Sequence, residues 1–343
     1  MAALVGHHDF WNMTSEETLN VLWLRVDNLE TISVTFVILG IACTPVIVFG
    51  NSLVIWSIWK DPLKKLRRSP SGLIVLSMAT ADFLVGSVLL PTAVTWGWSM
   101  FHFKIPRIPY LAVGAVFVYV SVCHIFLLTL DTFFAIVSPL QYRAVVTPKG
   151  ISVAIVSCWI YFFIFEITFG LLQHRYFIIM ETAYNIQIIS ILLGISVMSA
   201  VMVKRFHLYC QKSELTHQST SQRQMILQRE RGLCKAIAVV ICAYLFCFIP
   251  WFVTHFLIYF CLPCFSDLSN LCLSYVVSTS LMHANSGVNP FIYAWRFPKY
   301  RETFMHLLKR RNNRSGQFIE HQFYDTRLQN IKESNYTRRI SAT

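Results

Sequence analysis

Seven long runs of apolar residues, separated by shorter polar segments, make up most of the chain. The runs cover residues 32–57, 71–96, 109–138, 151–173, 185–203, 236–260 and 271–294. A helix needs about 20 residues to cross the roughly 30 Å hydrocarbon core of a bilayer, so each run is long enough to span it. Because the backbone inside lipid must satisfy its own hydrogen bonds, such runs form helices. The pattern therefore predicts an all-α fold, a seven-transmembrane helix bundle.

Composition and charge indicate the same class of protein and add an orientation. Hydrophobic residues make up 55% of the chain and charged residues 13%, about half the usual share of charge in a soluble domain. Of the 29 lysines and arginines, 25 fall in residues 58–70, 139–149, 204–235 and 295–343. The positive-inside rule places these segments in the cytoplasm and the N-terminus outside. The net charge of +12 then favours contact with anionic membrane lipid, and nucleic acid is not an expected partner.

The segment after the last run has the pattern of a surface helix. Tyr300, Phe304 and Leu307 recur at helical spacing, with lysines and arginines around them. A helix of this kind lies on the inner surface of the membrane, and the polar, mixed-charge tail behind it is predicted to be disordered. The predicted organisation is an extracellular N-terminal segment 1–30, a seven-helix domain 31–296, an amphipathic helix 297–311 and a cytoplasmic tail 312–343.

Two features on the predicted outer side concern covalent modification. Asn12 begins the sequon Asn-Met-Thr, so it is a candidate glycosylation site. Cys261 and Cys264 lie in the short loop between the sixth and seventh runs. In an oxidising compartment this pair can close a small disulfide, and two free thiols are the alternative.

Asp82 lies in the middle of an otherwise apolar run. A charged side chain at that depth costs at least about 3 kcal/mol, so it has to face the bundle and find polar partners. The third and seventh runs offer Ser121, Asn285, Ser286 and Asn289. A carboxylate with hydroxyl and amide groups suits a hard cation such as sodium, and a hydrogen-bonded water network without an ion is the alternative.

Several landmarks stand in successive runs: Gly50-Asn51, Ala81-Asp82, Trp159 and Asn289-Pro290-Phe291-Ile292-Tyr293. This set resembles the rhodopsin-like (class A) G protein-coupled receptors over nearly all of residues 30–310. The resemblance implies a multi-pass receptor of the plasma membrane that is not an enzyme and that signals to a heterotrimeric G protein and to arrestin. It also implies that the Asp82 group lines a sodium pocket, and that helices kinked at Pro250 and Pro290, with Tyr293 below, tilt to open a cytoplasmic cavity.

Two departures from the family concern activation and loop structure. Where the family has Asp/Glu-Arg-Tyr at the end of the third span, this chain has Asp131-Thr132-Phe133, although the acid that pairs with the family arginine remains as Glu230. Both cysteines of the usual extracellular disulfide are also absent. The alternative to a coupling receptor is therefore a non-coupling or decoy receptor. A transporter or channel is a further alternative, but the spans show no internal repeat.

The resemblance places the ligand among aromatic residues in the outer half of the bundle. Receptors of the family that bind amines carry an aspartate in the upper third span, and this chain has no acid at Val113-Gly114-Ala115, which argues against an aminergic salt bridge. The seventh span, with His283, is locally similar to the adenosine receptors, so a nucleoside-like ligand is one expectation. The predicted cleft is aromatic, has no fixed charge and suits a small, neutral or anionic ligand; its lining residues are His283, His255, Trp251, Phe252, Phe248, Gly114 and Val118.

Overall fold

Helices form all the regular structure in the part of the chain that the computed structural model describes. The described residues are 29–61, 66, 68–89, 91, 108–215, 239, 242–258, 261, 267–296, 300, 302, 303 and 305. The helices are α3 (Leu29–Lys60), α4 (Pro70–Leu84) with a π-helical continuation η1 (Val85–Leu89), α6 (Ile108–Val137), α7 (Pro139–Val145), α8 (Pro148–Leu215) and α10 (Leu268–Arg296). A further apolar helix covers Cys242–Ile258.

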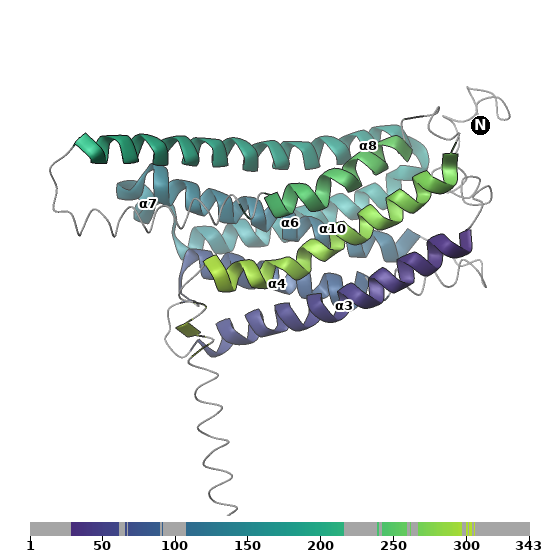
Figure 1. Cartoon of the computed structure of the whole chain (residues 1–343), viewed down its shortest axis with the longest axis horizontal. Coiled ribbons are helices and arrows are strands. Elements are labelled where there is room, and N and C mark those ends of the chain that lie inside the picture. Colours follow the sequence, from purple (N-terminus) through teal and green to yellow (C-terminus); the bar gives the residue numbers. More distant parts are fainter. Residues whose placement is uncertain are drawn as a thin grey trace, which may run out of the picture.

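The 68-residue helix α8 contains two crossings of the bundle. Its path bends at Tyr176, where the backbone leaves the helical region (φ −128°, ψ 40°). After the bend, the second half of α8 runs back alongside the first half. Two contacts join the halves: the ring of Phe169 lies 5.9 Å from that of Tyr184, and Gln187 Nε2 donates a hydrogen bond to Tyr161 Oη at 3.2 Å. With this bend, α3, α4 with η1, α6, the two halves of α8, the helix Cys242–Ile258 and α10 make seven crossings. Figure 1 shows how they lie along one another, and the predicted seven-helix bundle is confirmed.

Five of the crossings are long and apolar enough to span a membrane: Glu30–Lys60, Pro70–Val88, Val116–Val137, Pro148–Phe169 and Thr182–Arg205. The helix Cys242–Ile258 is apolar but shorter within the described residues. Large apolar side chains are exposed on the outside of the bundle; Ile160, Ile164 and Ile167 of α8 are 55–60% exposed. A soluble protein does not expose a continuous apolar surface of this extent, and lipid covers it in a membrane protein.

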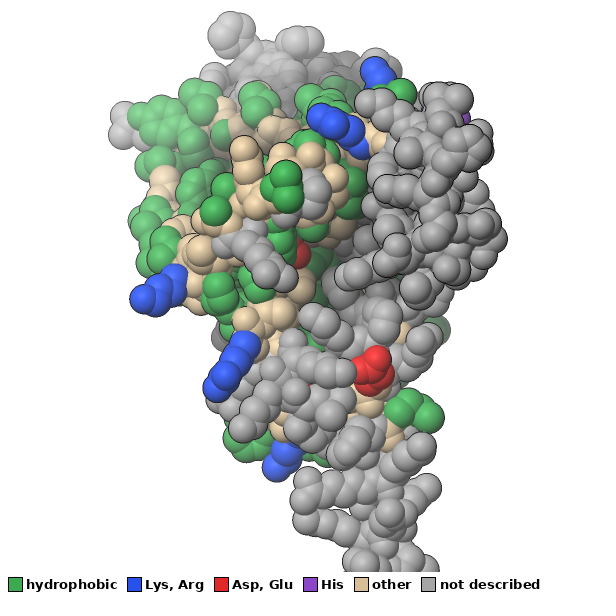
Figure 2. Space-filling view, turned by 90° about the vertical axis from the view of Figure 1, so that its left-hand side faces the viewer, with side chains coloured by type: hydrophobic (Ala, Val, Ile, Leu, Met, Phe, Trp, Pro, Cys, Tyr) green, Lys and Arg blue, Asp and Glu red, His purple; other side chains and the backbone are tan. Residues whose placement is uncertain are grey.

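The two ends of the bundle differ in charge. We call them the Leu29 end and the Lys60 end, after the first and last residues of α3. Figure 2 looks onto the Lys60 end, where basic side chains surround an apolar body. The lysines and arginines whose side chains the structure describes are Lys60 at the end of α3, Arg68 just before α4, Lys149 at the start of α8, and Lys204 and Arg205 in its second half. At the same end, the second half of α8 continues ten residues past Arg205 to Leu215 and projects beyond its neighbours (Figure 1).

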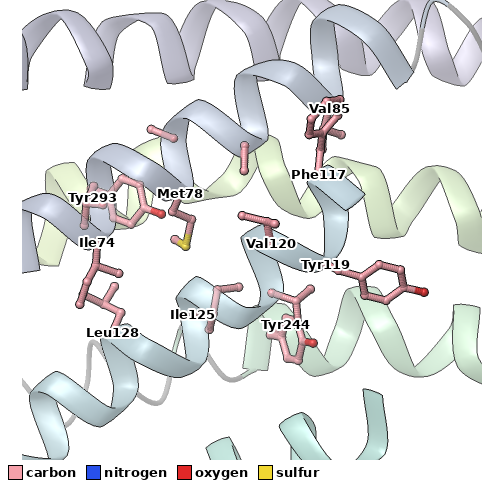
Figure 3. Close-up of a cluster of buried hydrophobic side chains, with 14 of the residues drawn as sticks. Ile74, Met78, Val85, Phe117, Tyr119, Val120, Ile125, Leu128, Tyr244 and Tyr293 are labelled. Atoms are coloured by element: carbon pink, nitrogen blue, oxygen red, sulfur yellow. The ribbon is translucent and has the colours of Figure 1, made fainter. Parts of the chain in front are cut away.

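The core is built around α6, which packs against α4 and both halves of α8. Ile74 and Met78 of α4 meet Val120, Ile125 and Leu128 of α6, and all five are at most 3% exposed. Tyr244 and Tyr293 complete the same cluster from the two C-terminal crossings (Figure 3). These buried surfaces fix the positions of the polar residues that lie between the helices.

Glycines allow the closest helix contacts, as is common for small residues in membrane bundles. A Cβ atom placed on Gly50 of α3 would lie 3.0 Å from Cγ of Pro290 on α10. A Cβ atom on Gly194 of α8 would lie 2.8 Å from Cε2 of Phe126 on α6. A larger residue at Gly50 would press on the Pro290 ring, and one at Gly194 would displace the Phe126 ring.

The predicted amphipathic helix lies mostly outside the described residues. Four of its residues, Tyr300, Glu302, Thr303 and Met305, are described as helical, and Tyr300 and Thr303 are buried. The ring of Tyr300 lies 6.3 Å from that of Tyr293. Burial, and then the nearby carboxylate of Asp61, raise the pKa of Tyr300. The N-terminal segment 1–28 and the tail 306–343 lie outside the described residues, so their predicted organisation stays a prediction.

Candidate functional site

A buried polar network surrounds Asp82 in the middle of the bundle. Its side chain has no exposed surface. Ser121 Oγ of α6 donates to Asp82 Oδ1 at 2.6 Å, and Asn289 Nδ2 of α10 donates to Asp82 Oδ2 at 2.8 Å. The side chain of Ser286 also faces this carboxyl group. One carboxylate thus joins α4, α6 and α10.

The predicted sodium-pocket residues fall into two groups. Asp82, Ser121, Ser286 and Asn289 come together. Asn285 is buried on α10 and is not among the partners of this carboxylate in the described part of the bundle. Carboxylate, hydroxyl and amide oxygens are ligands that a hard cation accepts. The four clustered residues therefore have the chemistry of a cation site.

Asn51 links the first and last helices beside this network. Its Nδ2 atom donates to Ile47 O of its own helix at 2.9 Å and to Ser286 O of α10 at 3.0 Å. The bond holds α3 against α10 close to the contact between Gly50 and Pro290. The sequence landmarks Gly50-Asn51 and Asn289-Pro290 therefore lie side by side, where they pack the two helices together.

An aromatic cluster occupies the half of the bundle nearer the Leu29 end. Tyr184, on the second half of α8, is at its centre. The ring of Tyr184 lies 5.0 Å from that of Tyr119, 5.9 Å from Phe169, 6.0 Å from Trp251 and 5.6 Å from His255. We call this set the aromatic cluster, with two further members that contact its rings: Phe162 and Tyr275.

The cluster joins the two C-terminal crossings as well. The His255 and Trp251 rings stack at 4.8 Å, and His255 lies 6.3 Å from Tyr275 of α10. One residue before His255, Thr254 Oγ1 and Ser278 Oγ are hydrogen-bonded at 2.7 Å. A molecule bound at these rings would therefore touch the helix pair that carries Pro250 and Pro290.

The predicted ligand residues are divided between this cluster and its surroundings. His255 and Trp251 belong to the cluster. Phe248 is buried one turn nearer the Lys60 end, 4.3 Å from Tyr244, and His283 is buried with Nδ1 hydrogen-bonded to Thr279 O at 2.7 Å. The structure places the remaining three as follows: Phe252 and Val118 pack partly buried against the core, and Gly114 lies in α6, but its surroundings are outside the described residues.

The prediction from sequence missed most of the cluster and one acid. Tyr119, Phe162 and Tyr184 were not expected there, because aromatic residues are frequent along the whole chain. Glu166 is 3% exposed on the first half of α8. A detectable signal existed for Glu166, since it is the one charged residue in the apolar run 151–173. The expectation of a site without fixed charge did not take account of it.

At the Lys60 end, Asp131 is hydrogen-bonded to the helix that follows α6. Tyr142 Oη of α7 donates to Asp131 Oδ1 at 2.7 Å. Burial, and then the hydrogen bond and charge of Asp131, raise the pKa of Tyr142. Thr132 Oγ1 donates to Leu128 O of its own helix at 2.8 Å. Glu230 lies outside the described residues, so its predicted loss of an arginine partner stays a prediction.

The cysteines divide into one bonded residue and several thiols. Cys261 is disulfide-bonded. Cys123 is a free thiol on α6, and its Sγ atom lies 3.2 Å from Cys158 Sγ on α8. Cys264 and Asn12 lie outside the described residues, so the pairing of Cys261 with Cys264 and the glycosylation of Asn12 stay predictions.

Seven helical crossings around a buried carboxylate network, with an aromatic cluster toward one end, define a seven-helix membrane receptor. Residues 50–293 match the family described as 7 transmembrane receptor (rhodopsin family). The match covers well over half of the chain, and the chain belongs to this family. Its members are G protein-coupled receptors rather than enzymes, which confirms the class predicted from the sequence.

Individual relatives are adenosine receptors at low identity. The chain is 23% identical over 295 residues to adenosine receptor A3 of Ovis aries, covering 81% of this chain and 90% of the relative. It is 23% identical over 310 residues to adenosine receptor A2a of Canis lupus familiaris, covering 80% of this chain and 74% of the relative. For adenosine receptor A3 of Canis lupus familiaris the identity is 23% over 298 residues, covering 81% of this chain and 91% of the relative.

Proposed function

We propose that this receptor binds a small, partly aromatic molecule at the aromatic cluster and passes the signal to a heterotrimeric G protein at the Lys60 end. The observation that carries the proposal is the position of Tyr184, whose ring contacts residues of α6, of the first half of α8 and of the helix Cys242–Ile258. A ligand held there would contact several crossings at once. It could favour one arrangement of the helices by binding that arrangement more tightly.

We propose that the buried network carries the change from the cluster toward the opposite end of the bundle. Phe248 lies one helical turn from Trp251 toward the Lys60 end, and Asp82 joins α4, α6 and α10. Prolines at positions 250 and 290 interrupt the helical hydrogen bonds, so the two C-terminal crossings can bend at these points. We propose that ligand binding shifts these crossings and that the Asp82 site binds sodium as an allosteric ion.

The proposed orientation follows from charge. The basic side chains at the Lys60 end favour the cytoplasmic face of the plasma membrane. The aromatic cluster then faces the extracellular side, where a ligand arrives, and the opposite end faces the G protein and arrestin.

Nucleosides are the first ligands to test, because the relatives are named as adenosine receptors. A receptor that binds ligand without activating a G protein is a second candidate, favoured by Thr132 in place of the family arginine. The two candidates differ in one measurement, since only the first predicts ligand-driven G protein activation.

The test is a ligand screen on the full-length chain in cells, read out as G protein activation with an unliganded control. For any active compound, His255→Ala should lower potency about tenfold or more, because a ring that contacts Tyr184, Trp251 and Tyr275 is lost. Val253→Ala is the matched control; Val253 lies two residues away and is 47% exposed on the outer face. Equal effects of both variants would contradict binding at the aromatic cluster. Binding without activation would favour the second candidate.

A further inference from the structure

Two cysteines from neighbouring crossings are in contact within the bundle. Cys123 of α6 and Cys158 of the first half of α8 are both free thiols, and their Sγ atoms lie 3.2 Å apart. A cysteine in a membrane helix usually serves as a small apolar side chain. That role does not require a second cysteine at hydrogen-bond distance on another helix. The contact therefore indicates a function for the two sulfur atoms together.

The register of the two helices brings these thiols together. The ring of Phe162 on α8 stacks on Tyr119 of α6 at 5.6 Å, with the ring planes 10° apart. Cys123 lies four residues after Tyr119, and Cys158 lies four residues before Phe162. Residues four apart share one face of a helix, so the thiol pair is the next contact, one turn along the same antiparallel interface. The aromatic stacking thus holds the two cysteines opposite each other.

The surroundings of the pair are apolar. No Asp, Glu, Lys or Arg occurs within four residues of either cysteine along the chain, and Cys123 packs against the main apolar core. Within the described residues, no group of three or more His, Cys, Asp or Glu side chains could hold a metal ion. Two thiolates and a metal ion would place charges in this apolar region, whereas a disulfide is neutral. The surroundings therefore favour a disulfide over a metal site.

We propose that Cys123 and Cys158 form a reversible disulfide between α6 and α8 when a peroxide oxidises them. Both side chains are only partly buried, so a small molecule can reach the pair. The cross-link would join the two helices one turn from the stacked rings of Tyr119 and Phe162. This modification site is separate from the proposed binding of a ligand and from coupling to a G protein.

The reaction removes two electrons from the thiol pair. One thiol loses its proton, and the Sγ–H group of the other stabilises the thiolate by a hydrogen bond. The thiolate sulfur attacks a peroxide oxygen, the O–O bond breaks, and the oxygen that leaves takes up a proton. The second sulfur then attacks the sulfenic acid, the S–S bond forms, the S–O bond breaks and water leaves. Two thiols and one hydrogen peroxide thus give one disulfide and two waters; an organic peroxide gives one alcohol and one water.

A cut between the two helices makes the cross-link visible as a change in fragment size. We would insert a protease recognition sequence between Val146 and Thr147, because Gly150 N donates to Thr147 Oγ1 at the start of α8 and this contact is then kept. The N-terminal fragment contains only two of the ten cysteines, Cys43 and Cys123. Any disulfide between the fragments must therefore involve one of these two residues.

The experiment uses the purified full-length receptor in lipid nanodiscs. The receptor is reduced, freed of reductant and treated at millimolar concentration with hydrogen peroxide or with tert-butyl hydroperoxide, which is lipid-soluble. It is then freed of peroxide, cut with the protease and denatured in N-ethylmaleimide, which blocks the remaining thiols. A non-reducing gel separates joined fragments from free ones, and peptide mapping of the uncut wild type identifies the linked cysteines directly.

We expect peroxide to keep the two wild-type fragments joined, and dithiothreitol to separate them. Cys123→Ala and Cys158→Ala should each abolish the joined band. Cys43→Ala is the matched control, since it removes another partly buried thiol from a span, and it should behave like the wild type. If one variant of the pair does not fold, the other stands in for it, because the two changes lie on different helices.

The contrary results are equally specific. Fragments that separate after treatment with either peroxide overturn the proposal. A joined band that persists in Cys158→Ala, or that disappears in Cys43→Ala, shows a different pairing and also overturns it. So does peptide mapping that finds sulfinic or sulfonic acid at Cys123 or Cys158 in place of the link. Joining by only one of the two peroxides supports the site and shows whether the oxidant arrives from water or from lipid.

Discussion

Replacing Tyr142 by phenylalanine removes one oxygen atom from the contact between α7 and α6. The lost bond runs from Tyr142 Oη to Asp131 Oδ1 at 2.7 Å, and Asp131 is 7% exposed. A hydrogen bond to a charged group contributes about 1.5–3 kcal/mol. Tyr142 is only half-buried, so solvent replaces part of the bond and we expect a loss of about 1–2 kcal/mol.

The loss should appear as a lower unfolding temperature. At about 2 °C per kcal/mol for a chain of this size, Tyr142→Phe should unfold about 2–4 °C below the wild type. A thiol-reactive fluorescent dye can follow unfolding, because Cys247 and Cys272 are buried and become accessible when the bundle opens. Tyr161→Phe is the matched control. The Tyr161 hydroxyl accepts a 3.2 Å bond at an exposed position, and its loss should shift unfolding by less than about 1 °C.

A double-mutant cycle with Asp131→Asn tests whether the two side chains act through each other. If they do, Tyr142→Phe should cost less in the Asp131→Asn background, with a coupling of about 1 kcal/mol. The reasoning is refuted if Tyr142→Phe leaves the unfolding temperature unchanged. It is also refuted if the variant lowers that temperature equally in both backgrounds.

The effect should also depend on pH in a defined direction. Burial and the Asp131 carboxylate raise the pKa of Tyr142, so the folded state holds the hydroxyl proton more tightly than the unfolded chain does. This stabilisation is fully present below the ordinary tyrosine value of about 10, and it is lost as the pH rises through the folded-state pKa. The difference between the wild type and Tyr142→Phe should therefore be constant from about pH 6 to 8 and shrink only in alkali.

Four further predictions concern the other features. Asp82→Asn should abolish any effect of sodium on agonist affinity, and equal sodium effects in wild type and variant would contradict the ion site. Thr132→Arg should give a larger ligand-driven G protein response at matched surface expression, because arginine supplies charge-assisted hydrogen bonds that threonine cannot; an equal or smaller response argues for coupling by another route. Non-reducing peptide mapping should find Cys261 joined to Cys264, and a bond from Cys261 to any other cysteine would show the pairing to be wrong. Gly50→Val should destabilise the bundle by about 1–3 kcal/mol in thermal unfolding, because its side chain would press on the proline ring opposite, and an unchanged unfolding temperature would show that the two helices separate freely.

The sequence predicted those parts of the molecule that lipid or a buried charge constrains. Helices follow from the length of the apolar runs, and the partners of Asp82 follow because a buried carboxylate needs polar groups from neighbouring spans. The aromatic cluster could not be predicted in the same way. Aromatic residues make up 15% of the chain. In a helix that is apolar on all sides, the sequence does not distinguish an aromatic residue that faces lipid from one that faces the bundle. The helix faces of Tyr119 and Tyr184 depend on packing that no local pattern encodes.

The contact between Asp131 and Tyr142 shows a second limit. Eleven residues and a change of helix separate the two side chains. Only the angle between α6 and α7 brings them together, and spacing within one helix says nothing about that angle. Glu166 is different, since its isolation in an apolar run was visible in the sequence and its burial follows from the cost of exposing a charge to lipid.

The extension of α8 past the membrane gives a practical way to visualise this receptor. Ten helical residues beyond Arg205 correspond to about 15 Å of rod, which ends at Leu215 clear of the neighbouring helices. A compact protein joined there through an uninterrupted helix would be held at a fixed angle to the bundle. Such a chimera would give electron-microscopy images a rigid reference mass, without altering any residue of the aromatic cluster or of the Asp82 network.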